Sequence, residues 1–78
     1  MAQIEKLVLK LRGARGDSSY ADLRRLLEAS GWRLHRQRGS HVVFVREPAA
    51  PINFPLVGGR YVRREYVKDV LRRLDPLE

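Results

Sequence analysis

Apolar residues first recur along the chain with the spacing of a helical face. The first stripe follows the i, i+3, i+4, i+7 pattern and predicts a short helix over residues 3–12. It consists of Ile4, Leu7, Val8 and Leu11. A second helix is predicted over residues 20–30, because Ser19 and Asp22 resemble a capping box at its start and Gly31 marks its end.

From Trp32 onward, apolar and polar residues alternate with a period of two, which is typical of a strand. An apolar run follows over residues 42–45, and Gly39 lies between the two segments, so the pattern predicts a hairpin. Residues 52–54 form a short third strand next to Pro55, and prolines this close to a strand indicate a sheet edge. A last helical stripe, ended by Pro76, consists of Val62, Tyr66, Val67, Val70, Leu71 and Leu74.

The resulting order of elements, α-α-β-β-β-α, predicts an α+β fold with a three-stranded antiparallel sheet and helices packed on one face. At 78 residues, the chain is expected to be a single domain over residues 1–78. A domain of this size has a thin core, so a large substrate cavity is not expected. Chemistry on an open face suits a polymeric substrate better than a small metabolite.

The charge of the chain is strongly positive and unevenly distributed. The formal net charge is +7, and residues 31–46 carry four arginines and no acidic residue. Such a surface attracts a polyanion: nucleic acid, an anionic membrane or an acidic protein. The absence of cysteine excludes disulfides and thiolate metal sites. No apolar stretch is long enough to span a membrane and no signal-peptide pattern is present, so we expect a cytoplasmic protein.

The tripeptide Gly39-Ser40-His41 places an imidazole beside a turn in this basic segment. Histidine is the side chain that ordinarily titrates near neutrality, so one held among fixed cations suits binding a phosphodiester and moving a proton on it. The cations closest in sequence are Arg33, Arg36, Arg38 and Arg46. The segment therefore indicates RNA chemistry.

The length of the turn decides which residue lies opposite His41. A turn at residues 38–39 would pair His41 with Arg36 on the core face, whereas a turn at residues 38–40 would pair it with Gln37 on the face of Arg33 and His35. We expect the second, because it keeps the imidazole off the helix-covered core. The apolar residues that would share that face are Val43 and Val45.

A second basic feature lies on the predicted last helix. Arg64, Lys68 and Arg72 are four residues apart, so they form one ridge opposite the apolar stripe. The ridge could follow a phosphate backbone, or it could be an ordinary solvated helix face.

Three segments also resemble a known family: residues 31–32, residues 36–41 with Phe44, and residues 61–71. Together they resemble the HicA family of toxins, over about residues 19–74. The resemblance implies a double-stranded-RNA-binding-domain-like fold, to which the helix over residues 3–12 is an addition. It also implies an mRNA interferase, with RNA as substrate and a HicB-like antitoxin as partner.

In that family the histidine after Gly-Ser is catalytic, and His41 occupies this position. Adjacent strand residues point to opposite faces, so Ser40 and His41 cannot form a nucleophilic pair, and no acids or histidines with metal-ligand spacing lie near. The 2′-hydroxyl of RNA remains as the nucleophile, with His41 as general acid or base and neither metal nor cofactor expected. The residues expected to bind phosphate are Arg33, Arg36, Arg38, Ser40, Arg64, Lys68 and Arg72.

Two other functions are compatible with the same residues. A non-catalytic RNA-binding module would use the same basic face for binding alone. A basic adaptor that binds an acidic protein would account for the positive net charge, but it would assign no role to Gly39-Ser40-His41.

Overall fold

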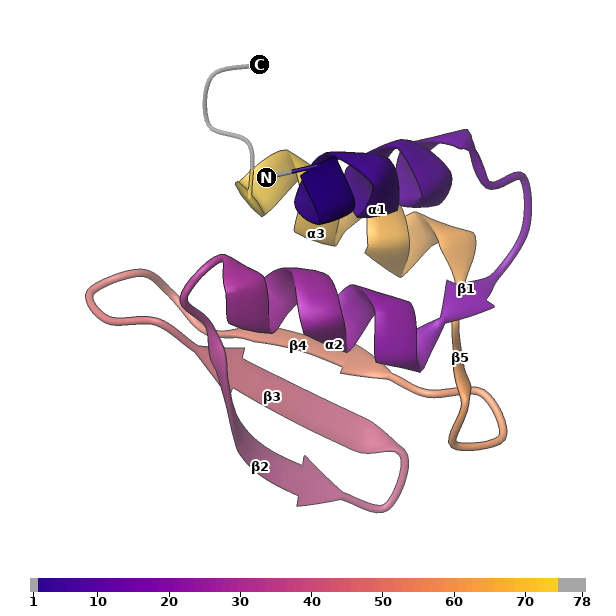
Figure 1. Cartoon of the computed structure of the whole chain (residues 1–78). Helices are drawn as coiled ribbons and strands as arrows, with labels where there is room; N and C mark the ends of the chain where they lie inside the picture. Colours follow the sequence, from indigo (N-terminus) through magenta and orange to yellow (C-terminus); the bar gives the residue numbers. More distant parts are fainter. Residues whose placement is uncertain (1, 75–78) are drawn as a thin grey trace.

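The computed structural model describes residues 2–74 and has the expected element order (Figure 1). The elements are α1 (Ala2–Gly13), β1 (Ser18–Ser19), α2 (Tyr20–Ala29), β2 (Arg33–Arg38), β3 (His41–Val45), β4 (Ile52–Pro55), β5 (Tyr61–Val62) and α3 (Arg64–Leu74). The two-residue strands β1 and β5 pair with each other, and they were not expected from the sequence. Val62 accordingly belongs to β5 rather than to the last helix. The helix stop expected at Pro76 lies outside the described residues.

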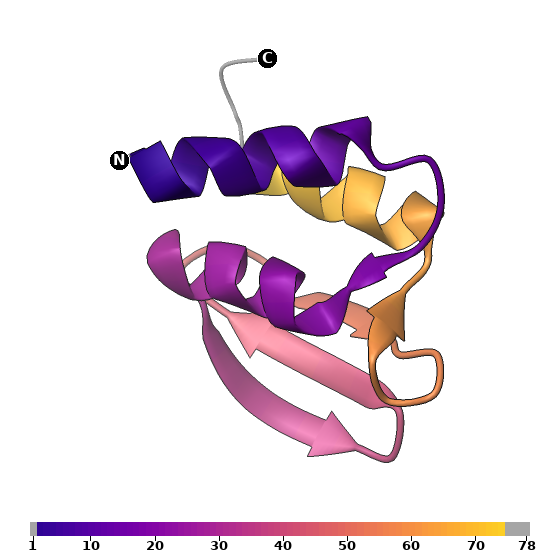
Figure 2. The ribbon, with the colours of Figure 1, turned by 45° about the vertical axis from the view of Figure 1, so that its right-hand side comes forward.

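The main sheet has three antiparallel strands in the order β2-β3-β4. Its central strand is the β-branched and aromatic run predicted as half of a hairpin, and Val42 and Phe44 are fully buried on one face. Figures 1 and 2 show α1, α2 and α3 on the same side of this sheet. The α+β class with helices on one face is therefore confirmed, and the other face is left without a covering element among the described residues.

An aromatic cluster fills the space between the sheet and α2. Tyr20 packs edge-on against Phe44 and Phe54, with ring centroids 6.5 and 6.2 Å away. Burial raises the pKa of the Tyr20 hydroxyl, and the neighbouring Arg24 offsets part of this effect. Trp32 is also buried, so Trp32 and Phe44 are both core residues.

The predicted cap of α2 is present and connects that helix to α1. The Ser19 hydroxyl accepts a hydrogen bond from the Asp22 backbone N–H at 3.4 Å, which satisfies one of the free donors at the helix start. The Asp22 carboxylate forms an ion pair with Lys10 of α1 at 2.8 Å. The first turn of α2 thus helps to position α1 above it.

Gly31 ends α2 and turns the chain into β2. Its φ of 91° lies in the left-handed region, where a residue with a side chain is strained. A Cβ atom there would lie 3.1 Å from Nε of Arg46, so that side chain lies against Gly31. Arg46 therefore sits at the opposite end of the β2–β3 hairpin from the turn, not beside His41 as its place in the sequence suggested.

Candidate nucleic-acid interface

The turn that carries His41 lies at neither of the two positions considered from the sequence. Arg38 pairs directly with His41, so the turn consists of Gly39 and Ser40 alone. Gly39 has a φ of 57° and Ser40 has a negative φ, the pattern of a type II′ hairpin turn with glycine first. Both registers predicted for His41, opposite Arg36 or Gln37, are therefore wrong.

A β-bulge at His35 sets which side of the sheet the arginines of β2 occupy. Leu34 pairs with Phe44 and Arg36 pairs with Val43, so His35 is an extra residue on β2. Without it, residues 34 and 36 would share a face. With it, Leu34 faces the core while Arg36 faces the other way.

Directly opposed residues of neighbouring strands project on the same face, so the pairing defines a surface that we call the open face. It consists of Arg33, Arg36 and Arg38 on β2, His41, Val43 and Val45 on β3, and Asn53 and Pro55 on β4. The arginines, His41 and Asn53 are exposed, and the two valines are half-buried. His41 thus lies on the open face with Val43 and Val45, as expected, and three arginines join it there.

His41 sits in the middle of one row across this face. Its backbone is opposite Arg38 on one side and Pro55 on the other. The Leu56 N–H donates to the Ser40 carbonyl at 2.7 Å, which ties the turn to the end of β4. Within residues 2–74, the His41 ring and the Ser40 hydroxyl make no hydrogen bond. Both groups are therefore available to a ligand.

The ridge predicted on α3 has a different environment. The guanidinium of Arg64 donates to the carbonyls of Leu11 and Arg12 at 2.8 and 2.9 Å, so it caps the end of α1. Arg72 pairs with Asp69 at 3.2 Å, and Lys68 is exposed. All three residues belong to α3, which lies with α1 and α2 on the covered side of the sheet (Figures 1 and 2). The structure therefore does not place the ridge on the open face.

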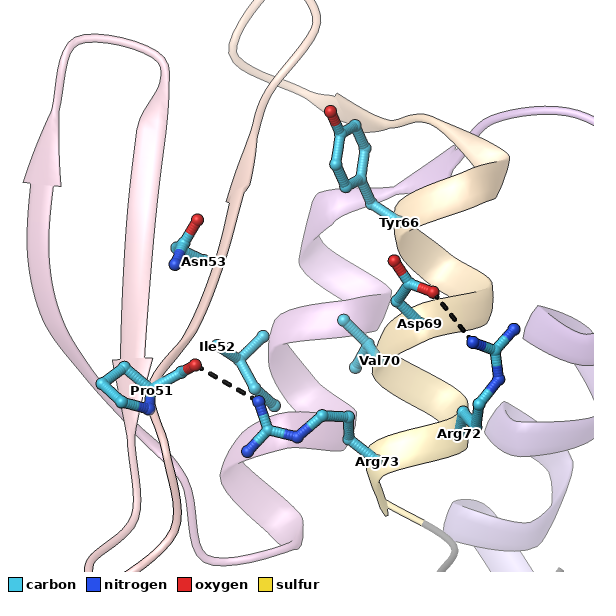
Figure 3. Close-up of a pocket in the computed structure, with 8 residues that line it drawn as sticks. All are labelled: Pro51, Ile52, Asn53, Tyr66, Asp69, Val70, Arg72 and Arg73. Atoms are coloured by element: carbon cyan, nitrogen blue, oxygen red, sulfur yellow. Dashed lines mark hydrogen bonds and ion pairs between the residues drawn. The ribbon is translucent and has the colours of Figure 1, made fainter.

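A groove between β4 and α3 was not foreseen from the sequence. It has a volume of about 330 Å³. Its lining consists of Pro51, Ile52, Asn53, Tyr66, Asp69, Val70, Arg72 and Arg73 (Figure 3). The alternation of β4 indicates that Asn53 faces away from the core, but only the packing of α3 beside that strand creates the groove.

Two further properties concern metals and membranes. In the part of the chain that the structure describes, no three histidine, cysteine, aspartate or glutamate side chains are grouped so as to hold a metal ion. None of the helices in that part has the length and apolar character needed to cross a bilayer.

A sheet backed by helices on one face, with one imidazole and three arginines on the other, defines a small α+β protein with a basic open face. The family model described as the HicA toxin of bacterial toxin–antitoxin matches residues 20–75, and the chain belongs to this family. It is thus the toxin member of a toxin–antitoxin pair, from a family known for ribonuclease toxins, and its family implies an antitoxin partner. No curated protein and no solved structure matches the chain.

Proposed function

We propose that this toxin is a metal-independent endoribonuclease that cleaves mRNA, with His41 as its acid–base residue. The observation that carries the proposal is the pairing of His41 with Arg38 on the open face, across the turn of the Gly39-Ser40-His41 motif. This pairing sets a titratable ring beside a permanent cation on a surface that a polymer can reach. Membership of the HicA family supports the same chemistry.

In the proposed reaction the 2′-hydroxyl of a ribose attacks the adjacent phosphorus. The bond from O2′ to phosphorus forms and the bond from phosphorus to O5′ breaks, leaving a 2′,3′-cyclic phosphate and a free 5′-hydroxyl. His41 either accepts the proton of the 2′-hydroxyl or donates one to the leaving O5′, and water serves for the other transfer. Such general acid–base catalysis contributes about 10²–10⁴-fold in rate.

The arginines of β2 would bind the substrate backbone. Arg38 lies nearest the reacting phosphate, because it is directly opposite His41, and its planar guanidinium can bind two phosphate oxygens at once. Arg36 and Arg33 continue along the same strand and would bind neighbouring phosphates. The Ser40 hydroxyl is free to bind an oxygen at the turn. Lys68 and Arg72 of α3 would bind RNA more remotely, and Arg64 would do so only by giving up its bonds to α1.

The antitoxin would act by covering this face. We propose a HicB-like protein with an acidic surface, because the toxin carries a net charge of +7. The half-buried Val43 and Val45 would supply the apolar centre that a stable interface needs. Toxin, mRNA and antitoxin would meet in the cytoplasm.

Replacing each histidine in turn tests the catalytic assignment. We expect His41→Ala to lower RNA cleavage by at least about 100-fold, the scale of lost acid–base catalysis, while the far-UV CD spectrum and melting temperature stay unchanged. His35→Ala is the matched control, because His35 is also exposed on the same hairpin, and this variant should cleave RNA at the wild-type rate. Cleavage should also continue in excess EDTA. Full activity of a folded His41→Ala protein, or activity lost in EDTA and restored by a divalent ion, would refute the proposal.

One observation keeps a second function in view. In a catalytic triad a third residue orients the histidine ring by a hydrogen bond. Within the described residues, no side chain makes such a bond to His41. A non-catalytic RNA-binding module needs no such orientation. It would bind RNA with the same salt dependence but produce no cyclic phosphate ends.

A further inference from the structure

The groove between β4 and α3 opens beside the open face, and we propose that it holds one base of the RNA substrate and that Asn53 determines which base is preferred. This inference rests on the proposed function, because the base belongs to the nucleotide next to the phosphate that is proposed to react at His41. Asn53 belongs to both surfaces: it pairs with Val43 on the open face, and it lines the groove (Figure 3).

The position of Asn53 relative to His41 suits an adjacent nucleotide. Pro55 lies directly opposite His41, and Asn53 is two residues earlier on the same strand. At about 3.4 Å per strand residue, the two rows are about 7 Å apart. A backbone running over His41 could therefore place the next base at the mouth of the groove.

The residues that line the groove offer the two kinds of contact by which proteins recognise single-stranded RNA, namely hydrogen bonds to a base edge and stacking on a base. The Asn53 side chain is exposed and makes no hydrogen bond within residues 2–74, so its amide can both donate to and accept from a base edge. The half-buried ring of Tyr66 stands at one end of the groove and offers a stacking surface (Figure 3). Ile52 and Val70 form an apolar floor.

One arginine bridges the two sides of the groove. Arg73 of α3 donates to the carbonyls of Ala50 and Pro51 at 2.6 and 3.2 Å, and its guanidinium lies 5.4 Å from the centre of the Trp32 ring. These bonds fasten the start of β4 to α3. A pocket that is already formed loses less free energy in ordering when a base enters.

The same bonds argue against a peptide of the antitoxin as the occupant. A peptide would add as a strand along the free edge of β4, where it needs backbone donors and acceptors. Arg73 already occupies the carbonyls of Ala50 and Pro51, and neither Pro51 nor Pro55 has an N–H group. A flat base that needs only side-chain contacts suits the groove better.

Binding of RNA that cannot be cleaved tests this proposal separately from catalysis. The probes are 2′-O-methyl hexanucleotides of A, C, G and U, which lack the attacking hydroxyl, and their affinities are measured by fluorescence anisotropy at one salt concentration. We expect wild-type protein to prefer one base by about 5- to 100-fold, the discrimination given by a good amide–base contact. Asn53→Ala should reduce that preference to about threefold or less, and Asn53→Asp, which replaces the amide donor, should change the preferred base.

Gln37→Ala is the matched control. Gln37 is also an exposed amide on the sheet, but it pairs with Val42 and so lies on the other face, where its loss should leave the preference unchanged. Equal binding of all four probes, or the same preference in Asn53→Ala as in wild type, would overturn the inference while leaving the proposed ribonuclease intact. Failure to bind any RNA would overturn both. NMR shifts of the Asn53 side-chain amide caused by an acidic antitoxin peptide, but by none of the probes, would assign the groove to the protein partner instead.

Discussion

At the scale of single residues, Arg38 lies directly opposite His41, so the proposed mechanism makes it the cation best placed to assist the histidine. Directly opposed residues of an antiparallel pair have Cβ atoms about 4.5–5.5 Å apart, so the two side chains can reach the same phosphate. We expect Arg38→Ala to lower kcat/KM for RNA cleavage by about 10- to 100-fold, because a charged hydrogen bond contributes about 1.5–3 kcal/mol. Arg38→Lys should recover part of this loss, since it restores the charge without the planar fork.

Arg33→Ala is the control for that measurement. Arg33 pairs with Val45 at the far end of the same strand, so its loss should change kcat/KM by about threefold or less. Equal losses for Arg33→Ala and Arg38→Ala would mean that only the total charge matters, not the position opposite the histidine.

The side of the sheet on which His41 lies could be predicted from the sequence, but the residue opposite it on β2 could not. The alternation of Val42 and Phe44 with Val43 and Val45 fixes which side of β3 is buried, whatever lies on the next strand. The partner depends on the turn, and a glycine at position 39 suits two- and three-residue turns alike. The bulge at His35 has no signal at all, because histidine is an ordinary strand residue and no glycine marks the irregularity.

At the scale of elements, Arg64 and Lys68 of α3 are predicted to have separable roles. Arg64→Lys should lower the free energy of unfolding by about 1–2 kcal/mol in urea denaturation, because a lysine cannot bond to both carbonyls at the end of α1. RNA affinity should change little. Lys68→Ala should leave stability within about 0.5 kcal/mol of wild type, yet reduce the slope of RNA affinity against salt by about one unit.

The opposite pattern would reassign the two residues. If Arg64→Lys left stability unchanged and weakened RNA binding, Arg64 would be a phosphate ligand and α1 would be held by its other contacts, such as Lys10 with Asp22. If Lys68→Ala left the salt slope unchanged, the exposed side of α3 would be an ordinary solvated face.

The elements that could be predicted are those with enough residues to show a period. The apolar stripe of α1 indicated a helix, but not where that helix packs. Its packing depends on the ion pair of Lys10 with a residue 12 positions away, and on the bonds of Arg64 to carbonyls 52 and 53 positions away. The strands β1 and β5 have two residues each, too few for any alternation to be visible. The groove beside β4 likewise arises only when α3 packs in place.

At the scale of the whole molecule, the toxin has no described element that could close over its open face. The proposal that the antitoxin covers this face can be tested on the whole complex. We expect hydrogen exchange of the toxin–antitoxin complex, compared with the free toxin, to show protection over residues 36–45, with Val43 at its centre. Protection confined to α1 would instead mean that the antitoxin inhibits from a distance.

The bulge at His35 also bears on which changes in chain length the hairpin can accept. Because His35 has no partner on β3, removing it would leave a regular strand with Leu34 facing the core and Arg36 and Arg38 on the open face. Removing Gln37 instead would bring Arg36 opposite Val42 on the core face and place His35 opposite Val43, while Leu34 keeps Phe44 as its partner. A hairpin one residue shorter thus keeps all three arginines of β2 on the open face if His35 is the residue lost, and removes Arg36 from that face if Gln37 is lost.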